Sequence, residues 1–468
     1  MDTYNFDDAD DIDESKDSDD SAEELRAKFQ NSIGTGNTEA LEELVYSLQE
    51  KGKDEDALHY INLLLQHIPY SSDIWQLKGI SLNNLSRHAE ALEAFEKALS
   101  LNPAEIETII HKCIALENLD RYEEAIECYN EILKNEPENE DAFLMKAMVF
   151  EKRGDYEEAL TILNALKIVS PDNKLLWYEL GYCYDMLNRT DKALEAYQKN
   201  IEIDPFNYNA WYNCGIIYNK KMMFTKAIEN YDIALSIKEN FISALYNKGN
   251  TFANMGRLHE AIDCYKQTVR MDPKDIPAWH NMGNAFQELS EYDEAIKSFT
   301  QSIKLDPHHY ESYFGRGICY DLQKKYKKAL DDYNKALEIH RGDSDLWYAK
   351  ADTSYNLGRW RDALISYKMA VRINPNNFYA LFDLAETLLE YGYHKESLKT
   401  YNKCLDLKDD WADAYYGKAK VLFIMKKHHD AIEALKRSFK LDSTKRKLFE
   451  EEFPGVRSLK EFTHLLEK

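Results

Sequence analysis

Apolar and small side chains recur along the chain with a period of 34 residues, in twelve copies that run from Thr38 to Lys445 without insertion or deletion. Positions 4, 7, 8 and 11 of each copy lie three or four residues apart and so share one face of a helix. Positions 20, 24 and 27 share one face of a second helix. The pattern therefore predicts two amphipathic helices in every copy and an all-α fold.

Several repeat positions are restricted to one kind of side chain. Position 20 is Ala in eleven copies, position 24 is aromatic in nine, and position 8 is Gly in six. Position 4 holds five of the seven Trp, and position 32 holds eight of the ten Pro. Small residues at 8 and 20 allow the two helices to cross closely, and we expect the large rings at 4, 11 and 24 to fill the space around that crossing. Pro at 32 lacks an N–H and is expected to end the second helix.

One copy contains nearly all of these features together: Trp177, Leu180, Gly181, Tyr184, Ala193, Tyr197 and Pro205. With this pattern the chain resembles the tetratricopeptide-repeat family over 408 of its 468 residues. The resemblance implies a right-handed superhelical α-solenoid of antiparallel helix pairs. It also implies that the first helices line a concave groove, and that twelve copies make more than one superhelical turn.

The segments outside the repeats are expected to protect or extend the ends of the solenoid. We predict a disordered acidic tail over residues 1–21 and a candidate N-terminal capping helix over 22–37. Residues 446–468 are predicted to form a C-terminal capping segment, because Leu459, Phe462 and Leu465 follow one another at helical spacing.

Charge is distributed unevenly in this acidic chain, whose formal net charge is −24. Residues 1–24 carry twelve acidic side chains against Lys16 alone, and the other 444 residues carry only −13. The lack of a basic face disfavours nucleic-acid and anionic-membrane partners. We find no signal peptide and no apolar stretch near the ~20 residues of a membrane span, so we predict a cytoplasmic protein.

Reactive side chains show no catalytic arrangement. Nucleotide-binding glycine motifs, zinc-protease motifs and nucleophile-elbow motifs are all absent from the sequence. The seven Cys show no C-x-x-C spacing and no pairing logic, so we expect reduced thiols that serve as small packing residues. The pairs His308-His309 and His428-His429 are interpreted as surface histidines. We therefore predict a protein that is not an enzyme and needs no cofactor or metal.

The faces of the first helices opposite the packing face carry two ladders of side chains. Position 5 is a flat ring in each of copies five to twelve, beginning with Tyr178, Tyr212, Tyr246, His280, Phe314 and Tyr348. Position 6 is Asn213, Asn247 and Asn281 in three successive copies, and position 9 adds Asn250 and Asn284. In the family that this chain resembles, this face looks into the groove.

The ladders allow two interpretations. An Asn amide offers both a donor and an acceptor and so suits the backbone of an extended peptide, with the rings adding apolar area. This arrangement is similar to the groove in the repeat region of O-linked N-acetylglucosamine transferase. Alternatively, the same side chains pack between neighbouring first helices. A clamp for the C-terminal carboxylate of chaperones is disfavoured, because no copy has Lys at position 5.

Together these observations predict a non-enzymatic scaffold or adaptor that binds an extended segment of a partner protein in its concave groove. Two alternatives stay open. The chain could be a self-assembling structural module that uses its convex face or solenoid ends. It could also be a regulatory module whose acidic tail occupies a basic site. The oligomeric state and the identity of any partner are left open by the sequence.

Overall fold

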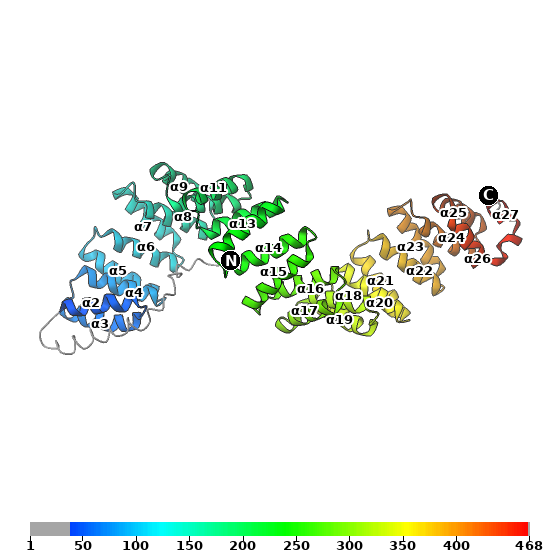
Figure 1. Cartoon of the computed structure of the whole chain (residues 1–468), viewed down its shortest axis with the longest axis horizontal. Helices are drawn as coiled ribbons and strands as arrows, with labels where there is room; N and C mark the ends of the chain where they lie inside the picture. Colours follow the sequence, from blue (N-terminus) through cyan, green and yellow to red (C-terminus); the bar gives the residue numbers. More distant parts are fainter. Residues whose placement is uncertain (1–37, 467–468) are drawn as a thin grey trace. The chain divides into compact units, whose positions relative to one another are not determined.

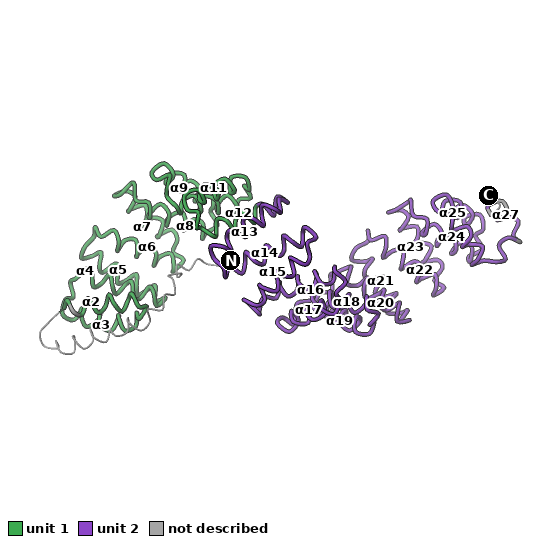
Figure 2. Tube along the Cα trace, in the orientation of Figure 1, with its two compact units in different colours: residues 1–217 green, residues 218–468 purple. Residues whose placement is uncertain are grey.

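The computed structural model describes residues 38–466, so the predicted segments 1–21 and 22–37 lie outside the described residues. Every regular element in that range is helical, with 26 α-helices and one short 3₁₀-helix (Figure 1). The chain divides into two compact units, with the boundary between Ile217 and Tyr218 (Figure 2). Within each unit, consecutive helices pack together, which confirms the predicted all-α solenoid of helix pairs.

Unit 1 contains five complete repeats and most of the first helix of the sixth. Its helices are α2 (Thr38–Glu50), α3 (Asp54–His67), α4 (Ser72–Asn84), α5 (His88–Leu101), α6 (Ile106–Asn118), α7 (Tyr122–Asn135), α8 (Glu140–Arg153), α9 (Tyr156–Val169), α10 (Lys174–Met186), α11 (Thr190–Ile203) and α12 (Tyr208–Lys220), whose last residues belong to unit 2.

Unit 2 completes the sixth repeat, contains the next six and ends in three short helices. Its helices are α13 (Phe224–Ile237), α14 (Ile242–Asn254), α15 (Leu258–Met271), α16 (Ile276–Glu288), α17 (Tyr292–Leu305), α18 (Tyr310–Leu322), α19 (Tyr326–Ile339), α20 (Ser344–Asn356), α21 (Trp360–Ile373), α22 (Phe378–Glu390), α23 (His394–Leu407), α24 (Ala412–Ile424), α25 (His428–Leu441), α26 (Thr444–Glu452), the 3₁₀-helix η1 (Pro454–Ser458) and α27 (Lys460–Leu466).

In the nine repeats that have a ring at position 24, this ring is buried in the core, and in several of them it lies against a glycine at position 8. Tyr197 is 1 % exposed, and a methyl group built on Gly181 would lie 2.6 Å from its ring. Phe299 is fully buried in the same way against Gly283. A side chain at position 8 would displace the ring, so the pairing of Gly with a ring explains the close crossing of the two helices.

The tryptophans at position 4 are less buried than the sequence suggested. Trp177, Trp211 and Trp279 are only partly buried. Each donates its indole N–H to the carbonyl of the position-32 proline six residues earlier, over 2.7, 2.9 and 3.1 Å respectively. An indole N–H must find an acceptor, and here that acceptor lies in the turn between repeats. The Trp–Pro hydrogen bond therefore holds this turn, while the rings of Trp177 and Trp279 also pack against the buried core of their repeats.

Two kinds of turn separate the helices. The second helix of a repeat ends two residues before the proline, and the residue between them leaves the helical region, as at the extended Asp272 (φ −122°, ψ 94°). The turn inside each repeat places position 15 in the left-handed region in all twelve copies. This position is Gly in only five copies and a residue such as Met222 (φ 57°) in the others.

The segment after the last repeat packs on the final helix pair. Phe449, Val456 and Phe462 are buried in one cluster with Tyr416, Leu422 and Leu435. Leu459 and Leu465 are partly buried against the same cluster. This contact covers apolar surface that the twelfth repeat has no further repeat to cover.

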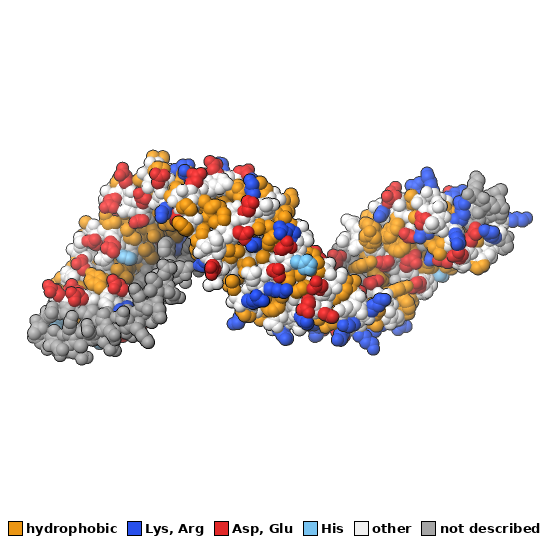
Figure 3. Space-filling model, viewed as in Figure 1, with side chains coloured by type: hydrophobic (Ala, Val, Ile, Leu, Met, Phe, Trp, Pro, Cys, Tyr) orange, Lys and Arg blue, Asp and Glu red, His pale blue; other side chains and the backbone are white. Residues whose placement is uncertain are grey.

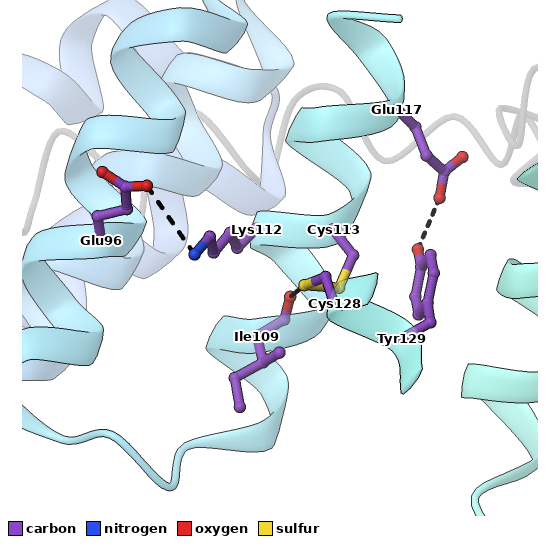
Figure 4. Close-up of a disulfide and its surroundings, with 7 residues drawn as sticks. All are labelled: Glu96, Ile109, Lys112, Cys113, Glu117, Cys128 and Tyr129. Atoms are coloured by element: carbon purple, nitrogen blue, oxygen red, sulfur yellow. Dashed lines mark hydrogen bonds and ion pairs between the residues drawn. A yellow bond between two sulfur atoms is a disulfide. The ribbon is translucent and has the colours of Figure 1, made fainter. Parts of the chain in front are cut away.

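The cysteines depart from the expectation of unpaired, reduced thiols. Cys113 of α6 and Cys128 of α7 form a disulfide, with their Cα atoms 5.8 Å apart (Figure 4). The expectation was wrong because these residues occupy positions 8 and 23 of one repeat, which face each other across the helix crossing. The other five cysteines are buried and free.

Within residues 38–466, no helix is long and apolar enough to span a membrane.

Candidate functional site

The position-5 rings do not stand free on the first helices. Several pack against the buried position-24 ring of their own repeat: the centroids are 5.6 Å apart for Tyr178 and Tyr197, and 6.1 Å apart for Tyr246 and Tyr265. Phe314 and Tyr348 pack on their partners in the same way, at 5.9 Å each. Tyr178 is 8 % exposed, whereas five rings of the following repeats are half-buried: Tyr212, Tyr246, His280, Phe314 and Tyr348. The rings thus form the edge of the core and expose only part of their surface.

Tyrosine hydroxyls at position 5 bond to the position-6 side chain of the following repeat. Asn213 donates its amide to the Tyr178 hydroxyl over 3.3 Å in unit 1, and Asn281 does the same to Tyr246 over 2.9 Å in unit 2. In repeat ten the direction reverses, because the Tyr348 hydroxyl donates to Asp383 over 2.6 Å. The side chains of Asn213 and Asn281 thus bridge neighbouring first helices, which is the packing role given above as the second interpretation of the ladders.

Asn250 and Asn281 belong to a network in unit 2. Asn281 donates to the carbonyl oxygen of Asn250 over 3.0 Å, and the Tyr265 hydroxyl donates to the same oxygen over 2.7 Å. Both hydrogens of the Asn281 amide are used, by Asn250 and by Tyr246, so its own carbonyl oxygen is the group left to accept a bond. Asn247, beside them on α14, is half-buried.

His280 joins Asn284 to this face as a neutral ring. Burial, and to a smaller extent the neighbouring His309, lower the pKa of His280 to about 4. Asn284 lies 3.0 Å from Nε2 and Ser312 Oγ lies 3.0 Å from Nδ1. Since the amide N–H can only donate, Nε2 accepts and Nδ1 carries the proton. Asn284 is thereby oriented by its contact with His280.

A hollow of about 210 Å³ lies among these side chains. Its walls include Asn250, Asn281 and Asn284 together with Tyr265 and the exposed Asn254. Three of the five predicted asparagines therefore meet at one place, between α14 and α16. The volume is below the roughly 300–1,000 Å³ of small-molecule sites and suits a single amino-acid side chain.

Unit 1 carries a different polar group at position 6 of repeat five. Burial raises the pKa of Glu179 well above its usual range, and the charge of Glu151 on α8 raises it further. Burial also raises the pKa of Glu151, whose carboxylate accepts a bond from the Cys183 thiol over 3.2 Å. Sequence analysis did not single out this pair, because Glu151 occupies position 12 and Glu179 position 6, and their contact depends on the stacking of repeats.

We expect Glu179→Gln to stabilise unit 1 at neutral pH. The folded pKa exceeds the unfolded value near 4.5, so the folded state binds protons more tightly and wild-type stability falls as pH rises through that interval. Gln removes the cost of ionising the pair. Thermal unfolding followed by circular dichroism should show a gain at pH 7 that shrinks toward pH 4.5. The exposed Glu195→Gln is the control, and an equal gain at both pH values would contradict the assignment.

The free thiols are buried in the described part of the chain. Burial raises the pKa of Cys214 to about 12 and that of Cys264 to about 11, so neither thiol is an activated nucleophile at neutral pH. No group of three or more His, Cys, Asp or Glu side chains between residues 38 and 466 is arranged to hold a metal ion.

Family models match more than half of the chain. Models described as tetratricopeptide repeat match residues 141–173, 175–207, 242–275, 280–344 and 412–445. A model described as Psidin, N-terminal TPR repeats region, matches residues 43–145. No curated protein matches the chain.

Solved structures of repeat proteins are similar over parts of the chain. YrrB, described as a TPR protein with an unusual peptide-binding site, is 23 % identical over 38 % of this chain and 92 % of its own, with a TM-score of 0.37. The C-terminal part of a TPR repeat-containing protein from Cytophaga hutchinsonii is 21 % identical over 51 % of this chain and 97 % of its own, with a TM-score of 0.45. MamA is 20 % identical over 34 % and 94 %, with a TM-score of 0.33.

Proposed function

The chain belongs to the tetratricopeptide-repeat family, and from this premise we propose that it is a non-enzymatic scaffold that binds an extended segment of another protein. The binding site in this proposal is the first-helix face of unit 2, centred on the hollow between α14 and α16. Tyr178, Tyr212 and Asn213 form a separate stretch of the predicted groove in unit 1.

The observation that carries the proposal is the meeting of Asn250, Asn281 and Asn284 around one hollow. The network holds their amides in fixed orientations, so a ligand would meet preset hydrogen-bonding groups and few side chains would have to be ordered on binding. The Asn281 carbonyl oxygen accepts from a peptide N–H, and the hollow receives one ligand side chain. The half-buried rings of Tyr246, His280 and Phe314 supply apolar contact beside it.

Magnitudes indicate a moderate affinity. Each new hydrogen bond contributes roughly 0.5–1.5 kcal/mol net, whereas ordering the ligand backbone costs roughly 1–2 kcal/mol per residue. Because the amides already bond to tyrosines, to His280 and to one another, few bonds are available and burial of the ring edges must add to them. We expect micromolar affinity for one segment, equivalent to about −8 kcal/mol.

Blocking the hollow should weaken peptide binding without disturbing the network. Asn254 is exposed on the rim at position 13 of repeat seven, so Asn254→Trp places an indole over the hollow and leaves Asn250, Asn281 and Tyr265 in place. Peptides selected from a random display library on the wild-type chain should bind this variant at least tenfold more weakly in fluorescence anisotropy.

The matched control is Asn118→Trp, an exposed Asn at the same position of repeat three in unit 1. It should bind the selected peptides like wild type. Equal affinity of Asn254→Trp and wild type would refute the hollow as the site, and a selection that enriches no peptide would refute peptide binding itself.

The predicted location and assembly stay proposals. The disulfide between Cys113 and Cys128 removes the argument from reduced thiols, since such bonds are rare in the cytosol. The cytoplasmic location therefore rests on sequence features alone. Self-assembly through the convex face or the solenoid ends is the second candidate function.

A further inference from the structure

A larger hollow of unit 2 lies between the second helices α15 and α17. Its volume is about 680 Å³. The floor is apolar: Val269, Met282 and Phe286 are buried and Trp279 is partly buried. None of the five asparagines of the proposed peptide site lines it, so it is a distinct surface of the same unit.

The rim of this hollow is basic. Four cations and one carboxylate line it: Lys266, Arg270, Lys297, Lys304 and Glu294. Glu294 pairs with Lys297 over 2.6 Å. Lys266, Arg270 and Lys304 are exposed and form no ion pair within the described residues, although the Lys266 ammonium lies 5.7 Å from the centre of the Phe286 ring. Figure 3 shows Lys and Arg side chains gathered along the edge of unit 2 formed by α15, α17 and α19.

This local charge is opposite to that of the whole chain, which carries −24. Elsewhere on the second helices, cations are commonly paired with a carboxylate three residues away, as Lys199 is with Glu202 and Lys335 with Glu338. Around this hollow, Lys266, Arg270 and Lys304 have no carboxylate partner within the described residues, and they surround apolar surface. Charge of one sign around an apolar floor selects a ligand that is both acidic and apolar.

We propose that this hollow is a second protein-docking surface, which takes an acidic segment of a partner polypeptide that carries one large aromatic side chain. The aromatic side chain lies on Val269, Met282 and Phe286, and the flanking carboxylates pair with Arg270 and Lys304 across the hollow. Because the surface is separate from the asparagine hollow, the chain would hold two segments at once, as a scaffold requires. The inference does not depend on peptide binding at the first helices.

The test uses the full chain and a fluorescein-labelled synthetic peptide, Glu-Asp-Glu-Trp-Glu-Asp-Glu, in fluorescence anisotropy at low ionic strength. We expect binding that weakens with added salt. The double variant Arg270→Glu with Lys304→Glu should weaken it at least tenfold. Arg372→Glu with Lys440→Glu, which reverses exposed cations at the same repeat position in repeats ten and twelve, is the matched control and should leave it unchanged. A peptide with Ser in place of Trp should also bind at least tenfold more weakly.

Three results would overturn the proposal. The first is no binding to the full chain or to a variant lacking residues 1–21. The second is equal loss in the two double variants, which would indicate unspecific attraction. The third is binding only after residues 1–21 are removed, which would assign the hollow to the chain's own acidic segment. Retention of peptide binding by Asn254→Trp is expected, and keeps this test separate from that of the first-helix site.

Discussion

Replacing Phe299 with Ala is expected to destabilise unit 2 by about 3–5 kcal/mol, the range typical of removing a buried aromatic ring. Phe299 is fully buried and touches two first helices: Gly283 of its own repeat on α16 and Gly315 of the next repeat on α18. The His280 ring also packs against it, with centroids 5.6 Å apart. One side chain thus joins two repeats, and its loss weakens both the helix crossing and the interface between neighbours.

Guanidinium denaturation followed by circular dichroism measures the decrease in the free energy of unfolding. Hydrogen exchange shows which helices are destabilised. Because solenoid repeats contact mainly their neighbours, amide protection should fall most in α16, α17 and α18. Phe206→Ala is the control, since this ring is 76 % exposed and its removal should cost little. A loss of stability no larger than that of the control would show that the position-24 ring is not the core of the repeat.

The repeat and its helices could be predicted from sequence because they depend on periodicity. Ala at position 20 in eleven copies and a ring at position 24 in nine copies define which helix faces meet, and the structure buries the position-24 rings as expected. The turn at position 15 could not be predicted in this way. Its left-handed backbone is imposed by the two helices it joins, so Met222 and Lys324 occupy it as well as Gly does.

Contacts between repeats were the harder part of the candidate site. Tyr178 and Asn213, or Tyr246 and Asn281, are 35 residues apart, one more than the repeat length. A ligand-binding groove and packing between neighbouring first helices place the same residue types on the same helix face. The sequence therefore left both interpretations open. The pairing of position 5 with position 6 of the next repeat becomes visible only when the stacking of the repeats is known.

The disulfide illustrates a signal that sequence did carry. Cys113 and Cys128 stand at positions 8 and 23, on the two faces that the small residues at 8 and 20 had already placed in contact. Comparing cysteines by repeat position, and not only by their spacing along the chain, would have found the pair. The basic hollow between α15 and α17 is different, because its lining combines residues of three helices, and periodicity does not reveal the spaces between helices.

Gly315→Ala is expected to destabilise unit 2 by about 1–3 kcal/mol, the usual cost of adding a methyl group to a filled core. A Cβ at this position would lie 2.5 Å from Cζ of Phe299, and the ring is held from the other side by Gly283. The effect runs against helix propensity, since Ala in place of Gly within a helix normally stabilises by about 1 kcal/mol. The sign of the measured change therefore decides whether packing or propensity governs this position.

Combining Gly315→Ala with Phe299→Leu should remove the conflict. Leu lacks the outer ring atoms that the new methyl group would meet, so the double variant should be more stable than the sum of the two single changes predicts, by about 1–2 kcal/mol. Denaturant unfolding of wild type, both single variants and the double variant gives this coupling free energy directly. A coupling near zero, or stabilisation by Gly315→Ala alone, would mean that the ring can move away from α18. The glycine at position 6 of repeat nine would then be a consequence of sequence drift and not of the ring that joins the two repeats.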